Sequence, residues 1–118
     1  MDESKPIFVQ IAEQVENDIL SAQMIEESQV PSTNELAAFY RINPATALKG
    51  INLLVENGIV YKKRGIGMFV AVGARDRIVA QRREQFAAQF VQPLIAEAFK
   101  LGISASELAD MIRKENQA

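Results

Sequence analysis

Apolar side chains recur every three or four positions in several stretches of the chain, which is the period of an amphipathic helix. The first stretch covers residues 7 to about 22. Two shorter stretches follow, and each has a start signal. Ser32 with Glu35 three residues later is a capping-box pattern, and Asn43-Pro44 places a side-chain cap before a first-turn proline. The sequence therefore predicts three helices, the third ended by Asn57-Gly58.

The apolar pattern then changes to that of short strands. Residues 59–61 and 68–72 are β-rich, and the basic turn Lys62-Lys63-Arg64-Gly65-Ile66-Gly67 lies between them. Two such runs around a glycine-containing turn predict a β-hairpin. A short extended piece is also expected at Val30-Pro31, because the residue before a proline avoids the helical region. Three helices followed by a basic hairpin are the layout of a winged helix-turn-helix.

A second helical region begins after Gly73-Ala74 and continues to about residue 100, where Pro93 should kink or divide it. Ser104 with Glu107 is a second capping box and opens a final short helix. Two helices cannot enclose a core unaided, so we expect this segment to pair with a second copy of the chain. The apolar residues expected at that interface are Phe86, Phe90, Leu94, Phe99, Leu108 and Ile112. The alternative is that these helices fold back on the first domain.

The expected fold is therefore mainly α with a small β-hairpin. A winged helix-turn-helix domain is expected at residues 1–73, and a short two-helix dimerisation tail is expected at residues 74–118. No internal repeat or low-complexity segment indicates a further division of the chain.

The composition argues against an enzyme. The 118 residues include no His and no Cys, so the commonest general base, the commonest metal ligand and thiolate chemistry are absent. We therefore expect no catalytic residues, no metal site and no cofactor. No apolar run is long enough to span a bilayer, and the acidic N-terminal residues do not resemble a secretion signal. These features predict a non-enzymatic cytoplasmic protein without a membrane partner.

The formal charge of −2 and an isoelectric point near 5.2 argue, on their face, against nucleic acid. The charges are segregated, however. Residues 1–40 hold eight acids and one base, whereas residues 61–83 hold seven bases and one acid. A local basic field attracts a polyanion even when the total charge is unfavourable. The alternative is a solvated basic face beside a loop.

The helix that begins at Pro44 carries the first candidate chemistry. Its leading residues are small and polar, as a helix requires to reach base edges in the major groove. Ala45 and Thr46 can contact a thymine methyl group or exchange hydrogen bonds, and Lys49 can reach a phosphate or a guanine edge. The alternative is an ordinary capped helix whose Thr46 and Lys49 face water.

The predicted hairpin carries the second candidate chemistry. Lys62, Lys63 and Arg64 lie on its entry side, and Gly65 and Gly67 flank its tip. Glycine permits positive φ and a close backbone approach to a neighbour. Such a tip can follow the DNA backbone or enter the minor groove, where cations are favoured. The glycine pair only superficially resembles a nucleotide-binding loop, because no helix follows it.

The combination of motifs resembles the GntR family of bacterial transcription regulators. The matching segments are Pro6-Ile7-Phe8-Val9-Gln10-Ile11, Val30-Pro31-Ser32, Glu35-Leu36-Ala37, Ile42-Asn43-Pro44 with Thr46, Leu53-Leu54-Val55-Glu56-Asn57-Gly58-Ile59-Val60, and Arg64-Gly65-Ile66-Gly67-Met68-Phe69-Val70. The tail, with Ala98-Phe99-Lys100-Leu101-Gly102-Ile103-Ser104 before Glu107-Leu108, is similar to that of the YtrA-like subfamily, whose two-helix C-terminal part serves dimerisation.

The resemblance implies a homodimer that binds a palindromic operator in double-stranded DNA, usually as a repressor. In this family the DNA contacts fall at the start of the second helix, along the third helix, called the recognition helix, and at the tip of the hairpin, called the wing. By position these are Ser32, Asn34, Ala45, Thr46, Lys49, Arg64, Gly65 and Gly67. The family often has Arg where this chain has Asn34, and an Arg or other polar group is frequent near Leu48.

Two further hypotheses accompany the interpretation of the chain as a DNA-binding homodimer. A winged-helix adaptor could instead bind a protein partner and show no DNA preference. A regulator could also be released from DNA by a small-molecule effector, although no residue pattern names the ligand. Because the tail is short, an effector pocket is expected at the dimer seam or between the domain and the tail.

Overall fold

The computed structural model describes residues 4–117 of the chain. The chain divides into two compact units, and the boundary in sequence falls between Ala80 and Gln81. Helix α4 (Ala74–Phe86) begins in the first unit and ends in the second. Along the described residues no helix is long and apolar enough to cross a membrane.

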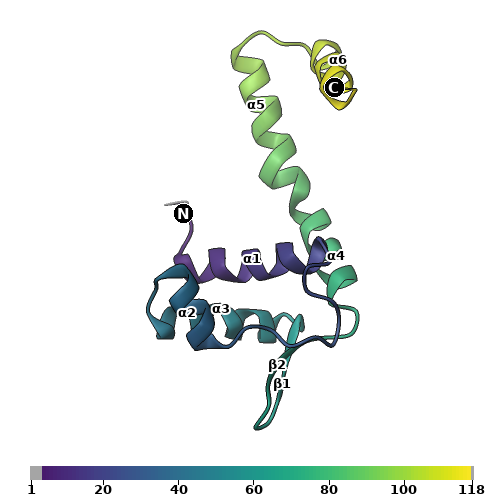
Figure 1. Cartoon of the computed structure of the whole chain (residues 1–118). Coiled ribbons are helices and arrows are strands. Elements are labelled where there is room, and N and C mark those ends of the chain that lie inside the picture. The colour runs from purple at the N-terminus through teal and green to yellow at the C-terminus, as the bar shows by residue number, and fades with distance from the viewer. Residues whose placement is uncertain (1–3, 118) are drawn as a thin grey trace. The chain divides into compact units, whose positions relative to one another are not determined.

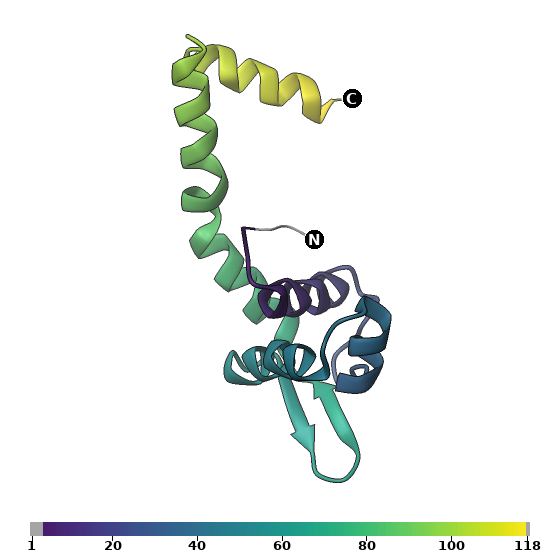
Figure 2. The same ribbon diagram turned by 90° about the vertical axis from the view of Figure 1, so that its left-hand side faces the viewer.

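The first unit is a three-helix cluster from which a β-hairpin extends (Figures 1 and 2). Its elements are α1 (Ile7–Leu20), α2 (Thr33–Tyr40), α3 (Pro44–Glu56), β1 (Val60–Lys63), β2 (Gly67–Val70) and the start of α4. The expectation of a mainly α fold with a small hairpin, arranged as a winged helix-turn-helix, is confirmed.

The core of the first unit forms where α1 packs against α3, with further residues from α2, the hairpin and α4. Its largest fully buried side chains are Ile11, Val15, Ile51, Leu54, Ile59, Val60, Val70 and Ile78. Ile78 and Ala74 are both part of this cluster, although they belong to α4. The first turns of α4 are therefore anchored in the core of the first unit.

The helix-start signals are confirmed by hydrogen bonds. The Ser32 hydroxyl accepts from the Glu35 backbone N–H at 3.1 Å, and the Glu35 carboxylate accepts from the Ser32 backbone N–H at 3.1 Å. The Asn43 side-chain oxygen accepts from the Ala45 N–H at 2.8 Å, one residue after Pro44. These bonds satisfy amide groups that the first turn of a helix leaves free.

At the tip end of the hairpin, the first strand is two residues longer and the second strand one residue longer than the apolar pattern predicts. Val60 pairs with Val70, and Lys63 pairs with Gly67, so that only residues 64–66 form the turn. Lys62 and Lys63 are therefore strand residues rather than turn residues. The expected extended piece lies along the other edge of β2, where the Val30 N–H donates to the Met68 carbonyl at 2.8 Å.

Gly50 sets the distance between α1 and α3. A Cβ at this position would lie 2.9 Å from the Phe8 carbonyl oxygen and 3.3 Å from the Ile11 Cβ. We expect Gly50→Ala to lower the free energy of unfolding by about 1–3 kcal/mol, because the overlap with backbone outweighs the better helix propensity of alanine. Urea denaturation followed by circular dichroism measures this. A more stable variant would show that α1 moves aside freely.

The second unit contains the end of α4, a π-helical turn η1 (Ala87–Val91), α5 (Gln92–Lys100) and α6 (Ala105–Asn116). The predicted division near Pro93 takes the form of this wider turn, in which the Gln92 N–H donates to the Ala87 carbonyl. A proline has no N–H and crowds the carbonyl four residues earlier, here Gln89, so the helix widens instead of breaking.

Ser104 caps α6, but the reciprocal bond differs from the prediction. Its hydroxyl accepts from the Glu107 N–H at 3.1 Å, as expected. The Glu107 carboxylate lies 3.2 Å from the same hydroxyl rather than bonding the Ser104 backbone. The cap is therefore confirmed, whereas the full capping box is not formed.

Candidate nucleic-acid interface

Helices α2 and α3 form a helix-turn-helix whose turn is fixed by Arg41. This residue adopts a left-handed conformation with φ 56°, and the Ile42 N–H donates to the Ala37 carbonyl at 3.0 Å. The chain then extends into Asn43, which caps α3. The turn thus sets the start of α3 beside α2, as a helix-turn-helix requires.

The first turn of α2 presents Ser32 and Asn34, and both residues are exposed. The Ser32 hydroxyl already accepts the N–H of Glu35. Hydrogen bonds from the backbone N–H and the hydroxyl of Ser32 hold the pKa of Glu35 below its usual range. Glu35 therefore stays ionised and keeps the cap closed, with Asn34 held at the positive end of the helix dipole.

Helix α3 turns one face to the core and the opposite face outward. The buried face consists of Ala47, Gly50, Ile51 and Leu54. Ala45, Leu48, Lys49 and Asn52 are exposed, and Thr46 is half-buried. Of the residues predicted on this helix, Ala45 and Lys49 are therefore accessible and Thr46 is partly so. Asn52 was not predicted, although its spacing of three and four residues from Lys49 and Leu48 places it on the same face.

Lys49 is directed toward α1. Its ammonium group lies 5.3 Å from the centroid of the Phe8 ring, within the range of a cation–π contact. Lys49 is four residues after Ala45 and three before Asn52, so it borders the leading exposed strip of α3, which we define as Ala45, Leu48 and Asn52. Its ammonium group is turned to the α1 side of that strip.

The cations of the hairpin do not share one face. Alternation along β1 places Tyr61 and Lys63 on one face and Lys62 on the other. The Lys63 ammonium lies 4.4 Å from the Phe69 ring centroid and 6.0 Å from that of Tyr61. Arg64 is exposed at the tip. The hairpin therefore presents positive charge on both sides and at its end.

The two tip glycines have different roles. Gly65 has φ 78° and open space where a side chain would point. Gly67 has φ 144°, and a side chain there would collide with the amide of Gln29. That amide donates to the Ile66 carbonyl at 3.1 Å and braces the tip. Gln29 was not predicted, because it lies 37 positions before its partner.

The basic stretch from Lys62 to Arg83 is divided between the hairpin and α4. Within the first unit, Arg77 reaches back to the Gly58 carbonyl at 3.5 Å, a bond too long to be strong. Arg75 and Arg77 are exposed on α4. The described residues hold no cluster of three or more His, Cys, Asp or Glu side chains suited to a metal ion.

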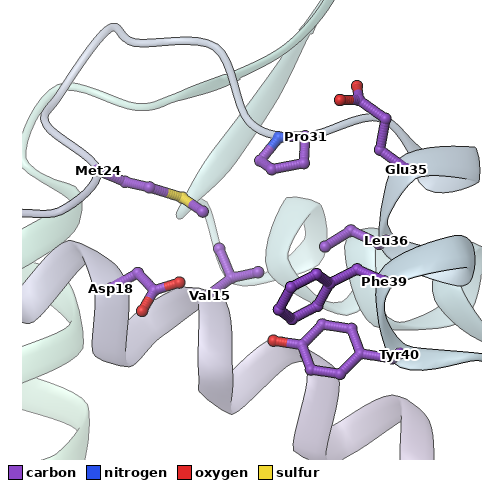
Figure 3. A pocket seen from close by; sticks show the side chains of 8 residues that line it. All are labelled: Val15, Asp18, Met24, Pro31, Glu35, Leu36, Phe39 and Tyr40. Atoms are coloured by element: carbon purple, nitrogen blue, oxygen red, sulfur yellow. The ribbon is translucent and has the colours of Figure 1, made fainter.

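A cavity of about 330 Å³ lies between α1 and α2 (Figure 3). Val15, Leu36 and Phe39 line it together with Asp18 and Glu35. The Phe39 and Tyr40 rings meet edge to face at 4.9 Å. Burial and the negative charge of Asp18 raise the pKa of Tyr40.

The second unit leaves most of its predicted interface residues exposed. The Phe86 and Phe90 rings lie 5.5 Å apart. Leu94, Leu108 and Ile112 line one apolar groove of about 480 Å³ between α5 and α6. Phe99 is 85% exposed and does not line that groove. The structure therefore brings together two subsets of the predicted residues and leaves Phe99 apart.

A helix-turn-helix followed by a basic, glycine-tipped hairpin defines a winged-helix DNA-binding protein. The family model described as bacterial regulatory proteins, gntR family, matches residues 8–70, which span every element from α1 to β2. The chain belongs to the GntR family of bacterial transcription regulators, and it is a regulator rather than an enzyme.

Similarity to individual proteins extends beyond the winged helix. The HTH-type transcriptional repressor YtrA of Bacillus subtilis (strain 168) is 30% identical over 94% of this chain and 85% of its own length. A putative GntR-family transcriptional regulator from Bacteroides thetaiotaomicron has a crystal structure with 37% identity and a TM-score of 0.77, covering 94% of this chain and 96% of that one. The resemblance to a YtrA-like regulator is thus confirmed over nearly the whole sequence.

A second solved structure matches only part of this chain. The AraR DNA-binding domain, crystallised in complex with operator ORX1, is 29% identical with a TM-score of 0.55. The match covers 60% of this chain and 87% of that domain.

Proposed function

We propose that the chain is a homodimeric transcriptional repressor that binds a palindromic operator. The observation that carries the proposal is the exposed face of α3 beside the cationic hairpin within one unit. YtrA is a repressor, and the AraR domain binds an operator, which supports the same role for this chain.

The proposed DNA contacts come from three elements of residues 1–73. At the start of α2, Ser32 and Asn34 contact the DNA backbone and fix the orientation of the protein on the duplex. On α3, the residues at or beside the major groove are Ala45, Thr46 and Lys49. Lys62, Lys63 and Arg64, with Gly65 and Gly67, form a wing that contacts phosphates or the minor groove. Because Lys63 also stacks on Phe69, we assign it a phosphate role rather than a base contact.

Residues 74–118 are proposed as the dimerisation tail, whose first turns, with Ala74 and Ile78, are anchored in the core of the first unit. Phe86, Phe90, Leu94 and Ile112 expose apolar side chains to a degree that is unusual for a monomer, and Leu108 lines the groove beside them. A second copy covers these residues. Two-fold pairing of the tail matches two-fold symmetry in an operator. Phe99 is included as a peripheral contact.

Release of the operator by a small-molecule effector is the final part of the proposal. The cavity in Figure 3 supports it, because one wall is α2, which also carries Ser32 and Asn34. A ligand that displaces α2 weakens DNA binding, and by linkage DNA weakens binding of that ligand. The sequence pointed to the dimer seam or the junction with the tail for such a pocket, whereas this cavity lies inside the first unit.

The test of the whole proposal is binding of the full chain to DNA from upstream of its own coding sequence. A gel shift and a footprint with two-fold symmetry are expected, and log affinity should fall linearly with log salt concentration. Because Phe39, Tyr40 and Asp18 line the cavity, the titration is repeated with small aromatic amines to test whether a ligand releases the protein from its operator. The absence of a specific complex at any salt concentration would favour the adaptor hypothesis instead.

Removing the wing-tip cation gives a narrower test. We expect Arg64→Ala to weaken binding to operator and random duplexes by a similar factor and to reduce the salt slope by about one unit, because a phosphate contact carries no sequence information. Fluorescence anisotropy at several salt concentrations measures both. Arg113→Ala, which removes a cation paired with Asp110 at 2.7 Å in α6, is the matched control. Equal slopes for Arg64→Ala and the wild type would exclude the wing tip from the interface.

A further inference from the structure

The leading exposed strip of α3 is apolar at the positions where a recognition helix meets base edges. Ala45 is exposed, and Leu48 is 47% exposed, one turn further along. Asn52 follows at the next turn of the same face. Lys49, the nearest cation on the helix, is held over the Phe8 ring on the α1 side.

The orientation of this strip is fixed by the packing behind it. Gly50 lies against the Phe8 carbonyl with no room for a side chain, and Ile51 and Leu54 are buried. Rotating α3 about its axis would expose these residues and open the contact with α1. The strip is therefore the surface that α3 presents once the helix enters a groove.

The chemistry of the strip distinguishes the bases. In the major groove only thymine presents a methyl group, whereas guanine, adenine and cytosine present polar atoms at their edges. A leucine against those polar atoms removes water without replacing its hydrogen bonds, which costs free energy. A leucine against a thymine methyl buries apolar surface on both sides.

We propose that Leu48, flanked by Ala45, reads thymine methyl groups and thereby specifies A·T base pairs in each half-site. The two side chains are three residues apart, about 4.5 Å along the helix axis at about 1.5 Å per residue. This is close to the about 3.4 Å step between base pairs, so the two side chains reach neighbouring pairs. Asn52 completes the strip, since its amide can bond an adenine edge.

This inference rests on the proposed DNA binding, and the experiment separates the two. Selection of the full chain from random duplexes first yields its preferred half-site. Each thymine is then replaced by deoxyuridine, which removes only the 5-methyl group. We expect a loss of about fourfold in affinity for each methyl that Leu48 or Ala45 contacts. The deoxyuridine effect at the Leu48 position should disappear in Leu48→Ala.

Val55→Ala is the matched control, because Val55 lies on the same helix and is 39% exposed, but it is two turns beyond Leu48 at the C-terminal end of α3. It should keep the full deoxyuridine effect, and circular dichroism should show that both variants fold. A selected site with G·C pairs opposite the strip, or deoxyuridine effects unchanged by Leu48→Ala, would overturn the inference while leaving DNA binding intact. Selection without any consensus would overturn the proposed function itself.

Discussion

Replacing Phe86 and Phe90 together with Asp will convert the proposed dimer to a monomer and lower operator affinity by about 100-fold or more. The two rings lie 5.5 Å apart, and both are more than half exposed in one chain, so the change leaves the fold of that chain intact. At a dimer interface the same change buries charge without a partner. In a dimer, binding of one half-site brings the second head close to the other half-site and raises its effective concentration there. Loss of the dimer removes this gain, which is worth a factor of about 10² to 10⁴ in operator affinity.

Sedimentation equilibrium measures the mass of the variant, and anisotropy measures its affinity. The salt slope should fall to about half the wild-type value, since only one head then neutralises phosphates. Replacing Phe39, an exposed phenylalanine on α2, with Asp is the matched control and should leave the mass unchanged. A variant that still sediments as a dimer would place the interface elsewhere on the chain.

The parts of the fold that depend on neighbours in sequence were predictable. Ser32 with Glu35 and Asn43 with Pro44 start helices because the groups they satisfy lie within three residues. The net charge of −2 was misleading because it describes the whole chain and not any local stretch. It sums an acidic stretch and a basic stretch that lie on different elements, and nucleic acid responds to the local field rather than to the sum.

The parts that depend on distant partners were not predictable. Nothing near Gln29 in sequence shows that its amide braces the wing tip and fills the space where a side chain at Gly67 would point. Lys49 has the right spacing for a base contact, but a ring from another helix holds its ammonium group. A pattern shows which face of a helix is polar and not which partner that face meets.

Ile78 shows the same limit of sequence patterns and leads to the second large expected effect. Spacing in sequence places this residue on one apolar line with Phe86 and Phe90, whereas it is 0% exposed within the core of the first unit. Ile78→Ala should therefore destabilise the DNA-binding head rather than the dimer. The expected loss is about 2–5 kcal/mol in the free energy of unfolding, from lost burial and the cavity left behind.

Urea denaturation at a fixed protein concentration measures this loss, because dimerisation makes stability depend on concentration. Ile25→Ala is the control, since Ile25 is 64% exposed in the same unit and its loss should stay within about 0.5 kcal/mol. Equal losses in the two variants would place Ile78 outside the core.

The contribution of α4 to the core also predicts how shortened chains behave. A chain ending at Val72 lacks both Ala74 and Ile78 and should be less stable than one ending at Ala80, so the DNA-binding head needs the first turns of α4 to stay folded.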